Sequence, residues 1–227
     1  MSAADEIRET YEARDAATRF DDWRASRYHP RNPMGRLFVE HNAVLIDLLN
    51  EQDISLHDLS VLDVGCGAGN WLRHLVELGA RPANLVGVDL STERLEFARQ
   101  ANPGISWLEA GDGPLPFPDA SFGLVMQTLV FSSIPDEQLR RRLAQEMLRV
   151  AGRYLMWLDL LPAESHLATF SGEQAHSYFP GTELVYRRRV QPGYFRHWYS
   201  HPWLCKTVAR FTDWRCESAL MLFEKQR

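Results

Sequence analysis

Short apolar runs alternate with amphipathic segments through the middle of the chain. Runs with strand character span residues 61–64, 85–89, 105–109, 124–127 and 153–159. Apolar positions that recur every three to four residues predict helices between them, near 71–78, 92–100 and 136–150. Strands that alternate with helices in this way are typical of an α/β fold, with a mostly parallel sheet covered by helices on both faces.

The ends of the predicted helices carry their own signals. Gly79 stands where a C-cap glycine ends a helix, and Ser91 precedes the next helix as an N-cap. The run Arg140 to Arg142 lies on the third helix and is expected to form a solvated face. These boundaries agree with the apolar pattern, so both signals predict the same elements.

The flanking regions are less regular. An amphipathic helix is predicted over 37–49, strands over 184–190 and 220–223, and a helix over 202–211. His41, within the first of these helices, has no partner at ligand spacing and is expected at the surface. No repeat or low-complexity linker separates these regions, which favours a single domain.

The net charge and the number of cysteines indicate which binding partners and which cellular compartment to expect. The net charge of −5 argues against nucleic-acid or membrane-surface binding, both of which need a basic field. The 3 cysteines are too scattered for a disulfide framework or a zinc site, so no metal is expected. Without a secretion signal or a membrane-spanning apolar run, we expect a soluble cytoplasmic monomer or homodimer that acts on a small molecule.

The stretch with the clearest chemistry is V-L-D-V-G-C-G-A-G-N, at 61–70. A strand that passes through glycines into a helix is the usual nucleotide-binding turn of α/β proteins. A dinucleotide loop needs glycine where this chain has Asn70, and a P-loop needs a lysine that is missing. Asp63 would repel a pyrophosphate and suits a ligand with an ammonium group. A buried aspartate that caps a turn is the alternative.

Two further carboxylates follow the next strands. Asp89 ends the second predicted strand, where a carboxylate can accept both hydroxyls of a ribose. Asp112 lies in the loop after the third strand and could accept from an exocyclic adenine amine. The three acids together favour a nucleoside that carries an amino acid.

Four motifs occur in order between residues 60 and 160, namely V-L-D-V-G-C-G-A-G, L-V-G-V-D-L-S, A-G-D-G-P-L-P-F-P-D-A-S-F and E-M-L-R-V. In these motifs the chain resembles the class I S-adenosylmethionine-dependent methyltransferases that act on small molecules. The resemblance implies a Rossmann-like α/β fold with a seven-stranded, mostly parallel sheet in the order 3-2-1-4-5-7-6. It also implies an antiparallel last strand and S-adenosylmethionine as cofactor.

The resemblance divides one domain, 1–227, into three parts. Residues 1–55 would form N-terminal helices and a lid, 56–160 the cofactor-binding core, and 161–227 a substrate-side insertion and closing strands. The glycine loop would wrap the methionine moiety, and the residues after the second, third and fourth strands would hold ribose, adenine and sulfonium. The positions assigned to the cofactor are Tyr28, Asp63, Gly65, Cys66, Gly67, Gly69, Asn70, Asp89, Leu90, Asp112, Gly113 and Gln127.

The chain departs from the family pattern at two places. Gly123 stands where the family usually has aspartate, and the turn before the fifth strand is shortened to Ala151-Gly152-Arg153. The first departure is expected to loosen a structural hydrogen bond and the second to shorten a turn. Neither involves an assigned cofactor contact.

The acceptor side has no signature motif. Methyl transfer from a sulfonium is an in-line displacement, and it needs a general base only if the acceptor must lose a proton. Asp159, at the end of the fifth strand, is a candidate base or orienting group, with helix capping as the alternative. Tyr178 is the second catalytic candidate. His197 and His201 lack a third ligand, which argues against a metal site.

Other activities stay open. The last third of the chain is rich in aromatic residues, which suits an apolar cage around a sulfonium. Such a cage would also suit non-methylating chemistry on the cofactor, by aminocarboxypropyl transfer or by cyclisation to azetidine-2-carboxylate with release of methylthioadenosine. A catalytically silent cofactor-binding subunit is disfavoured because the glycine loop and Asp89 are intact. A nicotinamide oxidoreductase is disfavoured by Asn70.

Overall fold

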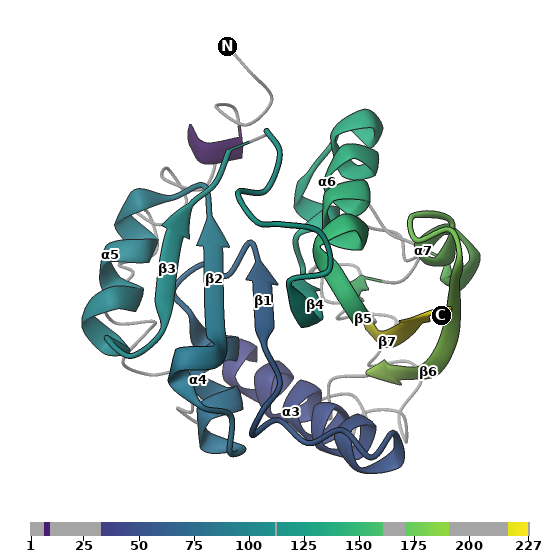
Figure 1. Cartoon of the computed structure of the whole chain (residues 1–227), viewed down its shortest axis with the longest axis horizontal. Coiled ribbons are helices and arrows are strands. Elements are labelled where there is room, and N and C mark those ends of the chain that lie inside the picture. Colours follow the sequence, from purple (N-terminus) through teal and green to yellow (C-terminus); the bar gives the residue numbers. More distant parts are fainter. Residues whose placement is uncertain (1–6, 10–32, 112, 161–170, 191–217, 227) are drawn as a thin grey trace, which may run out of the picture.

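The computed structural model describes residues 7–9, 33–111, 113–160, 171–190 and 218–226 (Figure 1). Helices and strands alternate through the central part as the apolar pattern predicts. The helices are α3 (Pro33–Glu51), α4 (Asn70–Glu77), α5 (Thr92–Ala101), α6 (Glu137–Val150) and α7 (Gly172–Ser177). The strands are β1 (Val61–Val64), β2 (Leu85–Asp89), β3 (Ser106–Glu109), β4 (Phe122–Thr128), β5 (Ala151–Leu160), β6 (Thr182–Val190) and β7 (Ser218–Lys225). The short 3-10 turns are η1 (Pro82–Asn84) and η2 (Phe131–Ser133).

These strands form a seven-stranded sheet in the order β3-β2-β1-β4-β5-β7-β6. Strands β1 to β5 pair in parallel, and β7 runs antiparallel to both β5 and β6. The predicted strand order and the antiparallel last strand are therefore confirmed. Parallel pairing brings the carboxyl ends of β1, β2, β3, β4 and β5 to one edge of the sheet, where ligands of open α/β sheets bind.

Two layers of helices cover the sheet. One hydrophobic cluster joins residues of α3, α4 and α5 to one face, and a second joins α6 and the α7 region to the other. In β4, Leu124 and Met126 belong to the first cluster and Val125 to the second. Central strands are thus buried on both faces, which explains why they read as continuous apolar runs.

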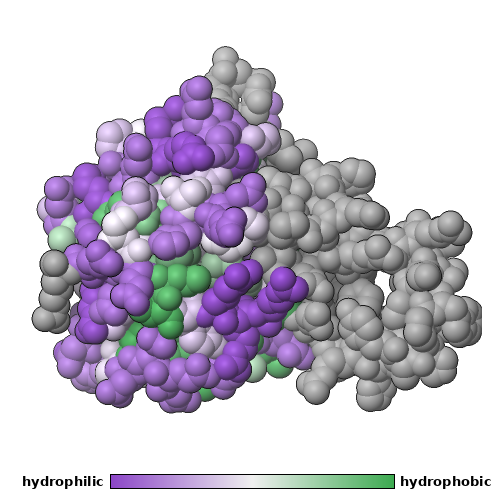
Figure 2. All heavy atoms as spheres, turned by 90° about the vertical axis from the view of Figure 1, so that its right-hand side faces the viewer, coloured by the Kyte–Doolittle hydropathy of each residue, from purple (hydrophilic) through white to green (hydrophobic). Residues whose placement is uncertain are grey.

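The edge strand β6 is protected by charge. It carries the arginines Arg187 to Arg189, and Arg188 pairs with Asp47 at 3.0 Å and with Glu51 at 2.7 Å, both on α3. The described part of this side of the molecule is mainly hydrophilic, with a small hydrophobic area (Figure 2). Charged side chains on an edge strand oppose pairing with another sheet.

Strand β4 begins two residues earlier than predicted, at Phe122, and so includes Gly123. The pairing between β4 and β5 shifts register between Phe122 and Leu124, because β5 has two residues between the partners Ala151 and Tyr154 where β4 has only Gly123. A methyl group on Gly123 would lie 2.5 Å from Cδ1 of Leu59, and its N–H donates to Oγ of Ser60 at 2.9 Å. Close packing against Leu59 accounts for glycine at this departure from the family, and Ser60 supplies a hydrogen bond there.

Helix α3 also begins earlier than predicted, at Pro33. Proline is compatible with this position because the first turn of a helix does not need its N–H group. The prediction that His41 lies at the surface is wrong. Its ring is only 2% exposed, its Nε2 lies 2.7 Å from Oγ of Ser218, and burial lowers its pKa to about 3. His41 shares the helix face of Leu45 and Leu48, which packs on the sheet.

The prediction of a solvated arginine run is wrong for Arg140. Its guanidinium donates to Oη of Tyr178 at 3.0 Å, to Oε2 of Glu137 at 2.7 Å and to the carbonyl oxygens of Ile134 and Pro135. Three of these acceptors lie where α6 begins and the fourth, Tyr178, follows α7, so burial of the charge is accompanied by hydrogen bonds. Arg141 and Arg142 are exposed as predicted.

The described residues include neither a membrane-spanning helix nor a metal-binding cluster. In this part of the chain no helix has the length and apolar character to cross a bilayer. The described His, Cys, Asp and Glu side chains form no group of three that could hold a metal ion. The predicted helix at 202–211 and the pair His197 and His201 lie outside the described residues.

Candidate functional site

The turn after β1 is fixed by backbone hydrogen bonds. The N–H groups of Gly65 and Cys66 both donate to the carbonyl oxygen of Val88, at 2.8 and 3.0 Å. Gly65, Gly67 and Gly69 have φ angles of 74°, 54° and 73°. This left-handed conformation is readily adopted by glycine alone, which accounts for the alternate spacing of the three residues.

The three glycines make room for different neighbours. A methyl group on Gly65 would lie 2.4 Å from Cγ2 of Val130, and one on Gly69 would lie 2.2 Å from Cη2 of Trp107. At Gly67 the nearest atom would be Nη1 of Arg94, at 3.8 Å. Gly65 and Gly69 therefore make room for the side chains of Val130 and Trp107, whereas a methyl group on Gly67 would only touch Arg94 at ordinary contact distance.

Asp89 is held at the tip of β2 by the loop itself. Its Oδ2 accepts from the N–H of Gly67 at 2.7 Å, and its Oδ1 accepts from the N–H of Ser91 at 2.9 Å. Each carboxylate oxygen can accept a further hydrogen bond. Ser91 also caps α5 as predicted, by accepting from the N–H of Arg94 at 3.4 Å.

Asp63 is fully buried, and neither of its oxygens has a hydrogen-bond partner among the described residues. Burial, with a contribution from the charge of Asp89, raises the pKa of this carboxyl from 3.8 to about 8. A buried acid without partners is costly unless a ligand supplies a donor. Beside it, burial also raises the pKa of the Cys66 thiol, which disfavours a thiolate there.

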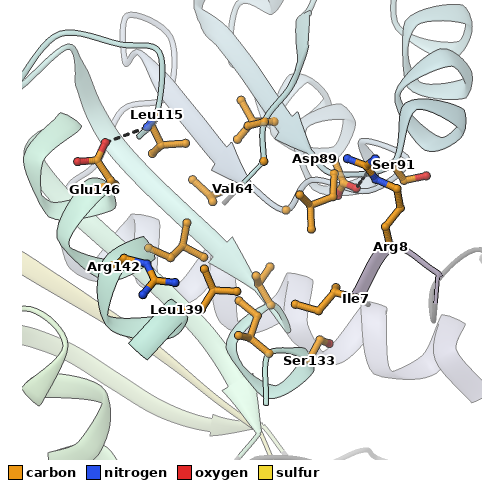
Figure 3. Close-up of a pocket in the computed structure, with 18 of the residues that line it drawn as sticks. Ile7, Arg8, Val64, Asp89, Ser91, Leu115, Ser133, Leu139, Arg142 and Glu146 are labelled. Atoms are coloured by element: carbon orange, nitrogen blue, oxygen red, sulfur yellow. Dashed lines mark hydrogen bonds between the residues drawn. The ribbon is translucent and has the colours of Figure 1, made fainter. Parts of the chain in front are cut away.

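A cavity of about 690 Å³ opens at this edge of the sheet (Figure 3). Small-molecule sites commonly have such a volume. The strand ends form one wall, with the predicted cofactor residues Gly65, Asp89, Leu90 and Gly113 among its lining. The opposite wall comes from η2 and α6, and includes Ser133, Leu139, Arg142 and Glu146.

An N-terminal segment, residues 7–9, borders the same cavity. Ile7 is 8% exposed and packs with Ile134 and Leu139, and the guanidinium of Arg8 lies 3.4 Å from Oε1 of Glu109. Figure 3 shows Arg8 near Asp89. The apolar pattern of this region was too weak to identify Ile7 and Arg8 in advance. Tyr28, the predicted lid residue, and Asp112 lie outside the described residues.

Asp159 stabilises the η2 part of the cavity wall through hydrogen bonds to its backbone. Its Oδ2 accepts from the N–H groups of Phe131 and Ser132 at 3.0 and 3.3 Å, and its Oδ1 from the N–H of Leu160 at 2.9 Å. Burial raises the pKa of the Asp159 carboxyl to about 6, against the opposing effect of these hydrogen bonds. The buried side chain is not among the described residues that line the cavity. These contacts match the capping alternative.

Gln127 is buried and stabilises the same turn. Its Oε1 accepts from the N–H of Val130 at 2.9 Å, and its Nε2 lies 3.5 Å from the carbonyl oxygen of Leu158. Between them Leu129 has a φ of 59°, a strained conformation for a residue with a side chain. Gln127 and Asp159 together hold the turn that forms part of the cavity wall.

Tyr178 lies apart from the cavity lining. Its hydroxyl donates to Oε2 of Glu137 at 2.8 Å and accepts from Nε of Arg140 at 3.0 Å, and its ring centroid is 5.1 Å from that of Phe131. Asn70 is likewise in a structural contact, because its Oδ1 accepts from Nη2 of Arg73 at 3.1 Å. The structure does not bring these two side chains into the described cavity lining, and their functional roles stay predictions.

The sheet order, the glycine turn and the carboxylate at the tip of β2 define the class I S-adenosylmethionine-dependent methyltransferase fold. Residues 61–152 match the family described as a methyltransferase domain. This match covers the glycine loop and the strand ends, so the chain is similar to that family over this region.

Curated relatives share this part of the chain. A trans-aconitate 2-methyltransferase of Azoarcus sp. (strain BH72) is 42% identical over 77 residues, which cover 34% of this chain and 30% of the relative. A fatty-acid O-methyltransferase of Mycolicibacterium smegmatis is 30% identical over 104 residues, which cover 45% and 37%. The chain thus spans about a third of the length of these two relatives.

A solved structure shares the fold over the whole chain. The magnesium protoporphyrin IX methyltransferase of Synechocystis PCC 6803, with bound S-adenosylmethionine, aligns with a TM-score of 0.68 at 16% identity and covers 100% of this chain and 98% of that one. The [4+2]-cyclase SpnF aligns with a TM-score of 0.60 at 18% identity over 80% of both chains. Likeness at this identity concerns the fold alone.

Proposed function

We propose that the protein is an enzyme that transfers a methyl group from S-adenosylmethionine to a small-molecule acceptor. The contact between Asp89, which lines the cavity, and the N–H of Gly67 in the glycine loop carries this proposal. It fixes a carboxylate and a bare backbone at one point of the cavity edge. The methyltransferase names of the curated relatives support the same activity.

The donors and acceptors of this wall fit the proposed cofactor. Asp63 is fully buried and outside the described lining, and we assign its two unpartnered oxygens to an ammonium group. Asp89 lines the cavity and retains acceptor capacity for ribose hydroxyls. Leu90, Ala110 and Gly113 offer an apolar surface for an adenine ring. When bound, S-adenosylmethionine supplies an activated methyl group on a sulfonium.

The protein's part in this reaction is alignment and exclusion of water. The turn Leu129–Ser133, held by Gln127 and Asp159, gives the cavity a fixed wall opposite the glycine loop. Ile7 covers the side of η2 and α6 through contacts with Ile134 and Leu139. Orientation of two reactants in such a site lowers the barrier without a dedicated catalytic group.

Product analysis tests this proposal. The protein is incubated with S-adenosylmethionine, with and without candidate acceptors, and the nucleoside products are separated by mass. S-adenosylhomocysteine formed only with an acceptor supports methyl transfer. Methylthioadenosine formed without an acceptor would replace the proposal with chemistry on the aminobutyrate arm. The aromatic residues from Tyr194 to Trp214, predicted to cage a sulfonium, lie outside the described residues.

A further inference from the structure

The three consecutive arginines of α6 have different surroundings. Arg140 donates to Oε2 of Glu137 at 2.7 Å, and Arg141 lies 2.8 Å from Oε1 of the same carboxylate. Arg142 lines the cavity and has no ion pair or hydrogen bond with another described residue (Figure 3). Two arginines thus hold Glu137, and the third presents its charge to the cavity.

Arg142 lies among both apolar and polar residues of α6, since Gln145 also lines the cavity. Leu139, Leu143 and Glu146 line the cavity from the same side of α6, at the spacing of successive helical turns. Oε2 of Glu146 accepts from the N–H of Leu115 at 2.8 Å and from Nη2 of Arg149 at 2.7 Å. Because Arg149 balances the charge of Glu146, the positive charge of Arg142 on the α6 wall has no ion-pair partner among the described residues.

The described lining of the cavity contains no general base. It holds no His, Cys, Tyr or Lys, and its acids are Asp89 and Glu146. Asp89 accepts from the backbone of the glycine loop, and Glu146 is paired with Arg149. An acceptor that keeps a proton at neutral pH would need a base, whereas a carboxylate has already lost its proton.

We propose that the acceptor is an apolar carboxylic acid, that Arg142 binds its carboxylate, and that the methyl ester is the product. This inference rests on the proposed methyl transfer. A carboxylate oxygen forms the bond to the methyl carbon while the carbon–sulfur bond breaks, and the electron pair of that bond stays on sulfur. The carboxylate and the sulfonium both become neutral, so no proton moves. Guanidinium groups favour carboxylates because their donors match the two oxygens.

Matched probes of one chain length test the acceptor class. Octanoate, octan-1-ol and octylamine are each incubated with the protein and S-adenosylmethionine, and methylated products are identified by mass. We expect methyl octanoate and no methylated alcohol or amine. Methylation of the alcohol or amine without the ester would overturn the inference, as would the absence of any ester.

Binding measurements test Arg142 separately from turnover. Octanoate is titrated calorimetrically into the protein with S-adenosylhomocysteine present. The Arg142→Gln variant should weaken octanoate binding roughly 10- to 100-fold, the loss of one charge-assisted hydrogen bond. Arg142→Lys should retain part of the affinity, and the control Arg141→Gln should retain all of it. Equal octanoate affinity in Arg142→Gln and the wild type would remove Arg142 from the site.

The same titrations separate this inference from the proposed function. If S-adenosylhomocysteine binds and octanoate does not, the carboxylate inference fails while cofactor binding stands. If S-adenosylhomocysteine itself does not bind, the proposed methyl transfer fails. Unchanged affinity for S-adenosylhomocysteine is expected in all three variants, because Arg141 and Arg142 lie on α6 rather than on the strand ends.

Discussion

The two walls of the cavity are built differently. The strand-end wall uses backbone conformation and fixed carboxylates, as the positive φ angles of the loop and the contact between Gly67 and Asp89 show. The α6 wall uses side chains on a helix, both apolar and polar, with Arg142 among them. Backbone shape constrains the sequence at fixed spacing, whereas helix side chains can change without altering the fold. We infer that the first wall serves the shared cofactor and the second the particular acceptor.

The largest expected effect concerns Asp63 and the pH dependence of stability. The unfolded chain loses this proton near pH 3.8 and the folded protein near pH 8, so between these values the folded state binds more protons. Rising pH therefore destabilises the free protein, on the order of 5 kcal/mol across this range. Asp63→Asn should remove this slope in urea unfolding measured from pH 4 to 8. The same slope in both proteins would contradict the account.

Ligand binding should change the charge of Asp63. An ammonium group beside it favours the ionised carboxylate, so cofactor binding at pH 7 should release a proton and strengthen as pH rises toward 8. Calorimetric titration in buffers of different ionisation enthalpy measures this release. Asp63→Asn is the control, and it should bind more weakly without proton release.

Alanine substitutions at Gly69 and Gly67 should lower the free energy of unfolding by different amounts. Gly69→Ala should destabilise the fold by roughly 3 kcal/mol or more, because its methyl group would overlap Trp107 in a left-handed backbone. Gly67→Ala should cost about 1–2 kcal/mol, from backbone strain alone. Urea unfolding of the two variants measures the difference, and equal losses would show that Gly67 is also packed internally.

Asp159 should act as a structural cap. Asp159→Ala leaves the N–H groups of Phe131, Ser132 and Leu160 without their acceptor, at a cost of roughly 2–3 kcal/mol. Asp159→Asn keeps one acceptor oxygen and should lose less. Urea unfolding compares the two, and a loss below about 0.5 kcal/mol in the alanine variant would contradict the capping role.

The parts of the fold that the sequence predicted are those with local signals. Strands β1 and β2 agree with their predicted ranges, because both are short apolar runs between turn residues. The cap at Ser91 is similarly local. Gly65, Asp89, Leu90 and Gly113 lie together at the cavity because motif spacing along parallel strands places them at one edge.

What sequence could not predict depends on neighbours distant in the chain. His41 is buried because Ser218 of β7 faces it, and Arg140 because Tyr178 supplies an acceptor. The carboxylate of Asp159 accepts from backbone N–H groups of η2, and the sequence separation of these residues does not predict this contact. The difference between Arg142 and its two neighbours follows from the position of Glu137 on one helix face.

The most direct test of the central claim is calorimetric titration of S-adenosylhomocysteine into the wild type and Asp89→Ala. Because Asp89 is assigned to the ribose hydroxyls, we predict one site per chain and a 10- to 100-fold weaker affinity in the variant, about 1.5–3 kcal/mol. Asp47→Ala, which removes an exposed carboxylate paired with Arg188, is the control and should bind like the wild type. No binding to the wild type, or equal affinity in Asp89→Ala, would contradict the account.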